Sequence, residues 1–338
     1  MRCDAACAPV FARHETFHPR YGWVKKALDA ATRDPKIFNA DSAVVELGVG
    51  KNMVRSIRFW GLAYQVITPS KDTGSRVPLA VPSNIGRTMF ADDGWDPYGE
   101  LTGTHWLLHW WLLAPGSIAP AWWLAFNEFP AVEFSDEQLE QFVLDRVRDW
   151  ADPHPSSVQK DVSCLLRMYA HGSTLRGAFD DAIDCPSRDL RLITPAAERG
   201  HYRFAIGAKP TLPPSVAAFA ALDFVARTDQ LARTVTVSRL ATEPGGPGRV
   251  FKLTEGALVD LLERAAIEHE GGITLTSAAG VPQVAFTDDP AVVATEILHD
   301  HYRGLIGSAR FPGSTLIAGR QGSEPHPLAP IVAAGALA

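Results

Sequence analysis

The segment from Gly50 to Ile67 constrains the fold most, because its two faces have opposite character. At about 100° per residue, its large apolar side chains fall on one arc: Met53, Ile57, Trp60, Tyr64 and Ile67. Lys51, Arg55 and Arg58 fall on the opposite arc. The pattern predicts a helix that packs through its apolar face and presents its basic face outward.

The basic side chains of this helix lie in its first two turns, where backbone N–H groups also favour an anion. The arrangement is typical of a helix that contacts the phosphate backbone of double-stranded DNA. The alternative interpretation is a solvated amphipathic helix on the protein surface. We therefore expect DNA contacts from the basic and polar residues of this region, namely Arg20, Lys25, Lys26, Lys51, Asn52, Arg55, Ser56, Arg58, Lys71 and Arg76.

The distribution of charge supports this placement. Residues 1–90 hold 13 Lys and Arg against 7 Asp and Glu, a net charge of +6, whereas the remainder holds 19 against 31, a net charge of −12. A mildly acidic chain thus gathers its positive charge at one end. Such an asymmetry indicates a nucleic-acid contact surface on an otherwise soluble protein.

The elements expected around the basic helix follow the order of a winged helix-turn-helix. Residues 22–32 have helical spacing, residues 44–50 read as a short strand or tight turn, and residues 79–89 as a returning strand. Lys71 and Arg76 would lie at the tip of the resulting hairpin. In such a fold the second helix enters the major groove and the wing touches the flanking backbone.

The same order recurs later in the chain. Residues 152–156, Asp-Pro-His-Pro-Ser, interrupt helices at 136–150 and 158–169 and predict a boundary between domains 1–151 and 156–303. Helices at 212–226 and 236–241, a helix capped by Thr254 and a hairpin at 271–286 form the second module. We expect a mainly α fold with small β wings, built from tandem winged helix-turn-helix-like modules, and a flexible tail over 304–338.

The second module is not expected to bind DNA. Its helix in the recognition position carries Glu255, Asp260, Glu263 and Glu268 against Arg264 alone, and this charge would repel phosphate. The module is therefore predicted to serve as a homodimer or partner surface.

Two groups of residues have the chemistry of a hydrolytic site. His14 to His18 spell H-E-x-x-H, a zinc motif when it lies on a helix, but Pro19 disfavours helical backbone at His18. His14 and Glu15 remain candidates for a general base beside a metal ligand. Asp180, Asp181, Asp184 and Asp189 could bind a hard cation such as Mg²⁺ or Mn²⁺, and the first three are the candidate catalytic residues, with a solvated acidic loop as the alternative.

The remaining composition indicates a cytoplasmic protein that does not enter membranes. Four scattered cysteines are too few for a disulfide framework, so a reducing compartment is expected. Residues 107–126 form the most apolar stretch, but Pro115 and Pro120 divide it. Its tryptophans are predicted to build a core, although stacking on a base is a second possibility.

Four stretches of the sequence together resemble the family to which SspB belongs: residues 11–26, 47–58, 184–186 and 247–251. The first contains His-Glu-Thr-Phe, the core of the family motif, and the second reads Leu-Gly-Val-Gly-Lys-Asn-Met-Val-Arg-Ser-Ile-Arg. His18 lies outside that core, which weakens the zinc interpretation. The resemblance implies a component of single-strand DNA phosphorothioation, an antiphage defence. It further implies that the protein nicks DNA beside a cysteine desulfurase, an ATPase and an ATP-pyrophosphatase-like protein.

Three functional hypotheses follow. The first is a DNA-binding nicking endonuclease that serves phosphorothioation, in which DNA binding rests on the residues and nicking on the resemblance. The second is a non-catalytic winged-helix adaptor that recruits the modification enzymes to DNA. The third is a transcriptional regulator, which would require a discrete operator.

Overall fold

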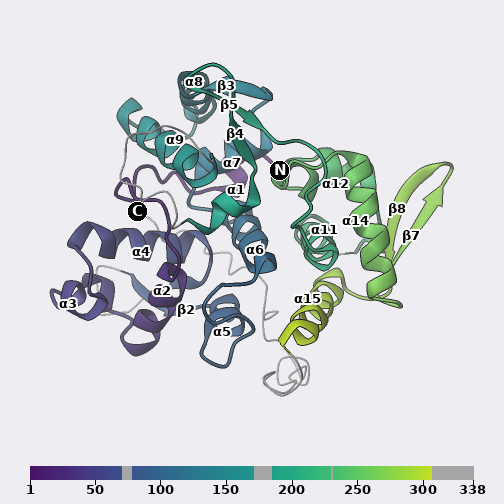
Figure 1. Ribbon diagram of the computed structural model, residues 1–338, viewed down its shortest axis with the longest axis horizontal. Helices are drawn as coiled ribbons and strands as arrows, with labels where there is room; N and C mark the ends of the chain where they lie inside the picture. The colour runs from purple at the N-terminus through teal and green to yellow at the C-terminus, as the bar shows by residue number, and fades with distance from the viewer. Residues whose placement is uncertain (71–77, 171–184, 230, 307–338) are drawn as a thin grey trace. The chain divides into compact units, whose positions relative to one another are not determined.

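The computed structural model describes residues 1–70, 78–170, 185–229 and 231–306. The chain divides into two compact units between Ala205 and Ile206. The N-terminal unit covers residues 2–205, and the described part of the C-terminal unit covers residues 206–306. The structure is mainly α-helical with small antiparallel sheets, as expected (Figure 1).

The first part of the N-terminal unit is a helical layer with one hairpin, formed by β1 and β2, which pair in antiparallel fashion. Its elements are α1 (Cys3–Ala6), α2 (Trp23–Arg33), η1 (Ile37–Asn39), α3 (Ala43–Leu47), α4 (Lys51–Ala63), β1 (Ile67–Ser70), β2 (Leu79–Pro82) and α5 (Asn84–Phe90).

Helix α4 has the two faces that its sequence predicts, but it ends at Ala63, and Ile67 begins β1. Ile57, Trp60 and Tyr64 are fully buried, whereas Lys51 and Arg55 on the opposite face are exposed. Gly50 precedes the first turn in extended conformation and makes no side-chain cap, so the first N–H groups of the helix are left for solvent or a ligand. Gly61 lies where α4 meets α2, and a Cβ there would come within 2.8 Å of the Ala27 Cβ.

Two local expectations for this region are wrong. Residues 43–47 form the short helix α3 rather than a strand, and Gly48 ends it with a φ of +64°, which glycine adopts without strain. The strand expected over 79–89 ends at Pro82. Ser83 then caps α5 by accepting a hydrogen bond from the Gly86 N–H at 2.9 Å.

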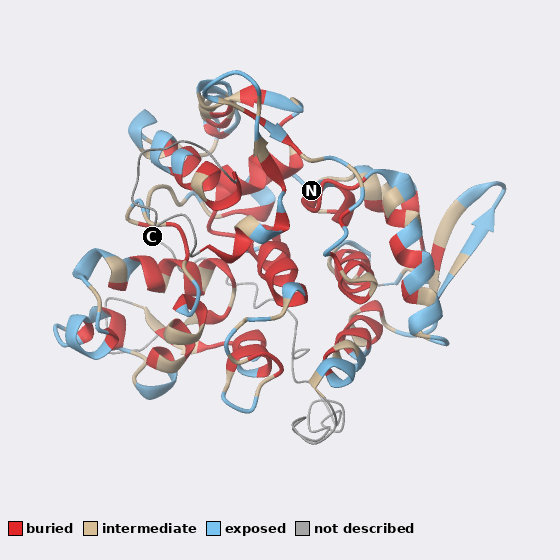
Figure 2. Ribbon diagram, viewed as in Figure 1, coloured by how far each residue is buried: buried red, intermediate tan, exposed pale blue. Residues whose placement is uncertain are grey.

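The centre of the N-terminal unit is an aromatic core. Helices α6 (Thr102–Leu113) and α7 (Pro120–Asn127) are buried along nearly their whole length (Figure 2). The prediction that the tryptophans build a core is confirmed for Trp106, Trp110, Trp111, Trp122 and Trp123, each at most 2% exposed. None of the helices in the described ranges combines the length and apolarity that a bilayer span requires.

The rest of the N-terminal unit places two helices beside a three-stranded sheet with the order β3-β5-β4. Its elements are β3 (Glu133–Ser135), α8 (Asp136–Val147), α9 (Pro155–Tyr169), η2 (Pro186–Leu190), β4 (Ile193–Pro195) and β5 (His201–Phe204). The break at 152–156 lies within this unit, because β3 before it pairs with β5 after it. The break separates α8 from α9, and the compact unit continues to Ala205.

The C-terminal unit has a second three-stranded sheet, with the order β6-β8-β7. Its elements are α11 (Pro214–Thr228), β6 (Thr234–Thr236), α12 (Val237–Thr242), α13 (Pro247–Val250), α14 (Glu255–Glu268), β7 (Ile273–Ala278), β8 (Val281–Phe286) and α15 (Pro290–Ile306). The hairpin expected at 271–286 and the Thr254 cap are both present, since the Thr254 side chain accepts from the Ala257 N–H.

The two three-stranded sheets lie in segments with a similar order of helices and strands. In one, the order along the chain is α7, β3, α8, α9, η2, β4 and β5, and in the other it is α11, β6, α12, α13, α14, β7 and β8, so the two orders differ by the short elements η2 and α13. In both, the last strand of the three lies at the centre of its sheet. Helix α9 therefore holds the position in the N-terminal unit that α14 holds in the C-terminal unit.

Candidate DNA-binding site

A hollow of about 990 Å³ lies over the basic face of α4 and is the strongest candidate site. It is bounded by α4, by residues 10–15 and by residues 38–44. Four basic side chains line it, Arg13, Lys51, Arg55 and Arg58, together with the carboxylates Glu15 and Asp41. We refer to this hollow as the basic cleft.

The basic side chains of the cleft differ in how accessible they are. Arg13 and Lys51 are exposed, and the Arg55 side chain is 53% exposed with its Nη1 3.4 Å from Glu15 Oε1. A contact of that length at the surface is weak, so Arg55 can exchange Glu15 for a phosphate at little cost. Arg58 lies deeper, where burial lowers the pKa of its guanidinium and its Nε has no partner among the described residues.

A tight turn at residues 12–17 forms one wall of the cleft. Ala12, Glu15 and Thr16 have φ values of +55°, +50° and +66°, in the left-handed region that residues with a Cβ rarely occupy. Such backbone persists only where surrounding contacts hold it. The turn aims Arg13 and Glu15 at the cleft while His14 points into the protein.

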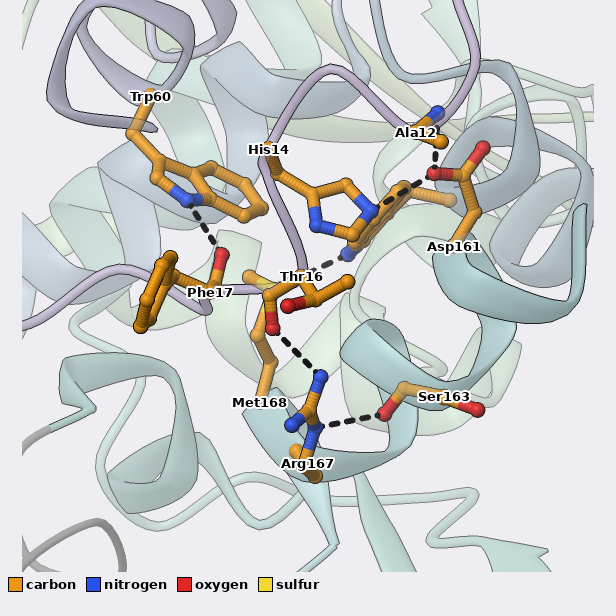
Figure 3. A network of polar contacts seen from close by, with 10 residues as sticks. Ala12, His14, Thr16, Phe17, Trp60, Asp161, Ser163, Arg167 and Met168 are labelled. Atoms are coloured by element: carbon orange, nitrogen blue, oxygen red, sulfur yellow. Dashed lines mark hydrogen bonds and ion pairs between the residues drawn. The ribbon is translucent and has the colours of Figure 1, made fainter. Parts of the chain in front are cut away.

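Four contacts hold this turn in place (Figure 3). Asp161 Oδ1 accepts from the Ala12 N–H at 2.8 Å and lies 2.8 Å from His14 Nε2. Arg167 Nη2 donates to the Thr16 carbonyl at 2.6 Å, and Trp60 Nε1 donates to the Phe17 carbonyl at 3.0 Å. Three of the four contacts involve α9 and the fourth comes from α4, so both helices fix the position of Arg13 and Glu15.

The His14–Asp161 pair is sealed from solvent. The two side chains are 0% and 2% exposed, and the His14 ring packs edge-on against Phe59 and Trp122. Burial raises the pKa of the Asp161 carboxyl, and the hydrogen bonds from His14 and the Ala12 N–H offset part of that rise. His14 and Asp161 therefore do not contact a ligand in the cleft; they affect the cleft by holding the turn at residues 12–17 in place.

The outer face of α9 forms a second surface beside the same turn. Gln159, Lys160 and Ser163 are exposed and, with Arg167 and Thr16, line a hollow of about 440 Å³. Asp136 also contributes to this hollow. We call Gln159, Lys160, Ser163 and Arg167 the α9 face.

Several residues expected to contact DNA are engaged within the protein. Ser56 is fully buried and therefore does not reach a ligand. Lys26 Nζ donates to the Leu47 carbonyl at 2.8 Å, and the Arg20 guanidinium lies 5.9 Å from the Trp23 ring. Burial alone would lower the pKa of Lys25, but its hydrogen bonds to Asp29 and Asp92 raise it and hold the ammonium group. Lys51, Asn52 and Arg55 are exposed as expected.

Of the candidate catalytic residues, the structure describes His14 and Glu15, and it separates them: His14 is buried, whereas Glu15 lines the cleft. Residues 14–18 form a turn rather than a helix, so the H-E-x-x-H spacing does not aim His14 and His18 at one metal. Asp180, Asp181 and Asp184 lie outside the described residues, as do Lys71 and Arg76. Within the described ranges, no group of three His, Cys, Asp or Glu side chains is arranged to hold a metal ion.

Comparison with known proteins places the chain in a family. Residues 11–302 match the family described as a protein of unknown function, DUF4007. The crystal structure of magnesium ion-bound SspB shares 38% sequence identity over 92% of this chain and 93% of that one, with a TM-score of 0.86. This chain belongs to the SspB family. A second SspB crystal structure gives 37% identity over the same shares, with a TM-score of 0.85. No curated protein matches the chain.

The sequence alone did not predict the residues that hold the turn at the wall of the basic cleft in this SspB-family member. Asp161 is the clearest case, because it lies on the apolar face of α9 with Val158, Val162 and Leu165. A carboxylate on an apolar helix face needs a buried hydrogen-bond partner, so its presence in the sequence indicates a buried polar contact. Its partner, His14, lies 147 positions away, and nothing in the local sequence connects the two.

Proposed function

We propose that this protein is the DNA-binding component of a phosphorothioation-based Ssp defence system, as its kinship with SspB implies, and that the basic cleft holds the phosphate backbone. The basic cleft is the observation that carries this proposal. It combines four cationic side chains with the uncapped N-terminus of α4 at one hollow. Phosphate binding at helix N-termini and by clustered Arg and Lys is the general basis of sequence-independent DNA affinity.

We further propose that the two repeated topologies are winged-helix modules. The order helix, strand, helices and antiparallel strands, with the short α13 added in the C-terminal unit, suits that fold, and α9 and α14 then hold the position of the recognition helix. The α9 face carries Gln159, Lys160 and Ser163, which suit base edges or phosphates. The exposed face of α14 carries Asp260 and Glu263, which repel phosphate. DNA therefore runs along α4 and α9 in this proposal, across the turn that joins their two hollows.

The experiment for DNA binding compares two arginines of the same unit. Arg55 lines the basic cleft, whereas Arg33 is exposed at the end of α2 and does not line it. Titration of a fluorescent duplex of about 20 base pairs should show Arg55→Glu weakening binding about tenfold or more, with Arg33→Glu close to wild type. Equal loss in both variants would mean that total charge, and not the cleft, determines the affinity.

Nicking of DNA is a proposal that rests on the family resemblance. The magnesium ion in the related SspB crystal structure is consistent with a metal-dependent step, but the described residues of this chain hold no group of three His, Cys, Asp or Glu side chains arranged for a metal ion. Glu15 and Asp41 line the cleft among four cations, a setting that opposes a divalent cation. The acidic residues at 180–184 remain the expected ligands.

The test for nicking incubates supercoiled plasmid with Mg²⁺ or Mn²⁺ and follows the open-circle form. Wild type is compared with Asp181→Ala, Glu15→Ala and, as a matched acidic control outside the cleft, Asp145→Ala, which changes an exposed residue of α8. Loss of nicking in Asp181→Ala alone supports the metal assignment. Nicking by all three variants at the wild-type rate overturns both catalytic assignments.

The buried position of His14 favours one second candidate, a non-catalytic adaptor that delivers partner enzymes to DNA. The sequence makes His14 a candidate general base, but at 0% exposure its imidazole does not reach a phosphate. An adaptor predicts DNA binding without open-circle product. It also predicts that partner proteins still co-purify after Arg55→Glu has weakened DNA binding.

A further inference from the structure

The C-terminal unit carries a groove between α14 and β7 with a volume of about 700 Å³. One face of α14 forms its first wall through Val259, Glu263, Ala266 and Ile267. The consecutive residues 273–277 of β7 form its second wall. Because neighbouring residues of a strand point to opposite faces, a hollow that touches all of residues 273–277 runs along the edge of the strand.

The edge of β7 that borders the groove has unused backbone groups. β7 is the outer strand of the sheet and pairs only with β8 among the described residues. The Gly272 carbonyl accepts from the Thr287 N–H, so the backbone of Gly272 faces β8. Every second residue of an antiparallel strand turns its N–H and C=O groups to the same side, so those of Thr274 and Thr276 also face β8. The N–H and C=O groups of Leu275 and Ser277, which are partly or fully exposed, consequently point away from β8, where an added strand would pair with them; Ile273 is buried and starts the strand.

The side chains of the groove define the chemistry of that strand. Ile267 is 75% exposed, and Val259 and Leu275 are partly exposed, so the walls offer apolar surface. Glu263 and Glu270 add negative charge, and no charged residue lies between Ile273 and Phe286. Figure 2 shows most of the β7–β8 hairpin as exposed or intermediate. An anionic ligand such as DNA is repelled here, whereas a cationic one is attracted.

We propose that this groove binds an extended peptide segment of a partner protein, with alternating basic and apolar side chains, as an additional strand on β7. Backbone hydrogen bonds to the β7 edge would supply affinity, apolar side chains would cover Ile267 and Leu275, and basic ones would meet Glu263 and Glu270. A second copy of this chain fits the groove less well, because its own β7 edge, Ile-Thr-Leu-Thr-Ser-Ala, brings no basic residue. The inference is independent of DNA binding and of nicking.

The binding test uses the full chain and a fluorescein-labelled hexapeptide that alternates lysine and valine, followed by fluorescence anisotropy. We expect saturable binding, and Glu263→Lys and Glu270→Lys should each weaken it about fivefold or more. Glu296→Lys is the matched control, since Glu296 is exposed on α15 of the same unit and does not line the groove. Loss of binding in Glu296→Lys to the same extent, or no binding by wild type, overturns the proposal.

A second peptide tests the strand pairing itself. The same hexapeptide with N-methyl groups on alternate backbone nitrogens keeps its charge but loses the donors that face β7. It should bind at least about tenfold more weakly than the unmodified peptide. Equal affinity of the two peptides overturns the added-strand geometry. Sedimentation completes the test, because a dimer that Glu263→Lys dissociates would show a second copy as the occupant and contradict the proposal.

Discussion

His14 Nε2 lies 2.8 Å from Asp161 Oδ1 in a fully buried contact that joins the turn at residues 12–17 to α9. The same oxygen accepts from the Ala12 N–H at 2.8 Å. One carboxylate thereby holds both the backbone and a side chain of a turn with left-handed residues at positions 12, 15 and 16. We infer that this contact maintains the wall of the basic cleft that carries Arg13 and Glu15.

Asp161→Asn is expected to lower the free energy of unfolding by about 1–3 kcal/mol, because the amide keeps the shape of the carboxylate but not its charge. DNA affinity should fall as well, since the turn then holds Arg13 less firmly. Chemical denaturation and duplex titration measure the two effects. Asp145→Asn, at an exposed position paired with Arg148, should change stability by less than about 1 kcal/mol. Equal effects of the two variants would show that Asp161 has no special role.

Arg167 allows positioning to be separated from charge. Its Nη2 donates to the Thr16 carbonyl at 2.6 Å while its Nε donates to the Ser163 carbonyl at 3.3 Å. Lysine keeps the positive charge but lacks the planar fork that makes both contacts. If Arg167 acts by holding the turn, Arg167→Lys and Arg167→Ala should weaken DNA binding to a similar degree, about threefold. Retention of wild-type affinity by Arg167→Lys alone would instead indicate a direct phosphate contact.

The close packing of α2 against α4 leaves no room for a side chain at Gly61. A Cβ at this position would lie 2.8 Å from the Ala27 Cβ and 2.9 Å from the Ile67 Cδ1. Gly61→Ala should therefore reduce stability by about 1–3 kcal/mol. Gly256→Ala in α14 is the matched control, because nothing lies within 4 Å of an added Cβ there. It should raise stability by about 0.5–1 kcal/mol. Thermal melts of both variants check the sign of each change.

Lys252 should make the stability of the C-terminal unit depend on pH. Burial, with smaller effects from Arg249 and Lys209, lowers the pKa of Lys252 from 10.5 to about 7. Between these values the unfolded chain binds a proton that the folded unit does not, so stability is lost as the pH falls toward 7. From pH 9 to pH 7 we expect a decrease of up to about 2 kcal/mol by chemical denaturation. Lys252→Met should remove the contribution of Lys252 and leave that of Lys209, whose pKa burial lowers to about 8, and the same pH dependence in both proteins would contradict the assignment.

Periodic sequence patterns predicted the longer helices but not the short α3 and α5. The predicted apolar arc of the basic helix is buried except at Met53, which is partly exposed, and the cap at Thr254 and the hairpin that follows α14 are both present. Ser56 lies at the border of that arc, where periodicity does not decide burial. The division at Ala205 has no local signal either, because it depends on the pairing of Phe134 with Tyr202 across the local break at 152–156.

The site was predicted in part, for a similar reason. Lys51 and Arg55 follow from helical spacing alone, since they lie opposite the buried face. The contribution of Arg13 depends on a turn whose backbone is held by Asp161 and Arg167 from a distant helix. No local propensity favours left-handed backbone at Ala12, Glu15 and Thr16, and only tertiary contacts impose it.

The salt dependence of duplex binding tests the central claim most directly. Removing one phosphate contact should reduce the slope of the logarithm of affinity against the logarithm of salt concentration by about one. For the double variant Lys51→Ala/Arg55→Ala we predict a slope smaller than that of wild type by about two, with Arg33→Ala unchanged. An unchanged slope in the double variant would contradict the claim that the basic cleft holds the phosphate backbone.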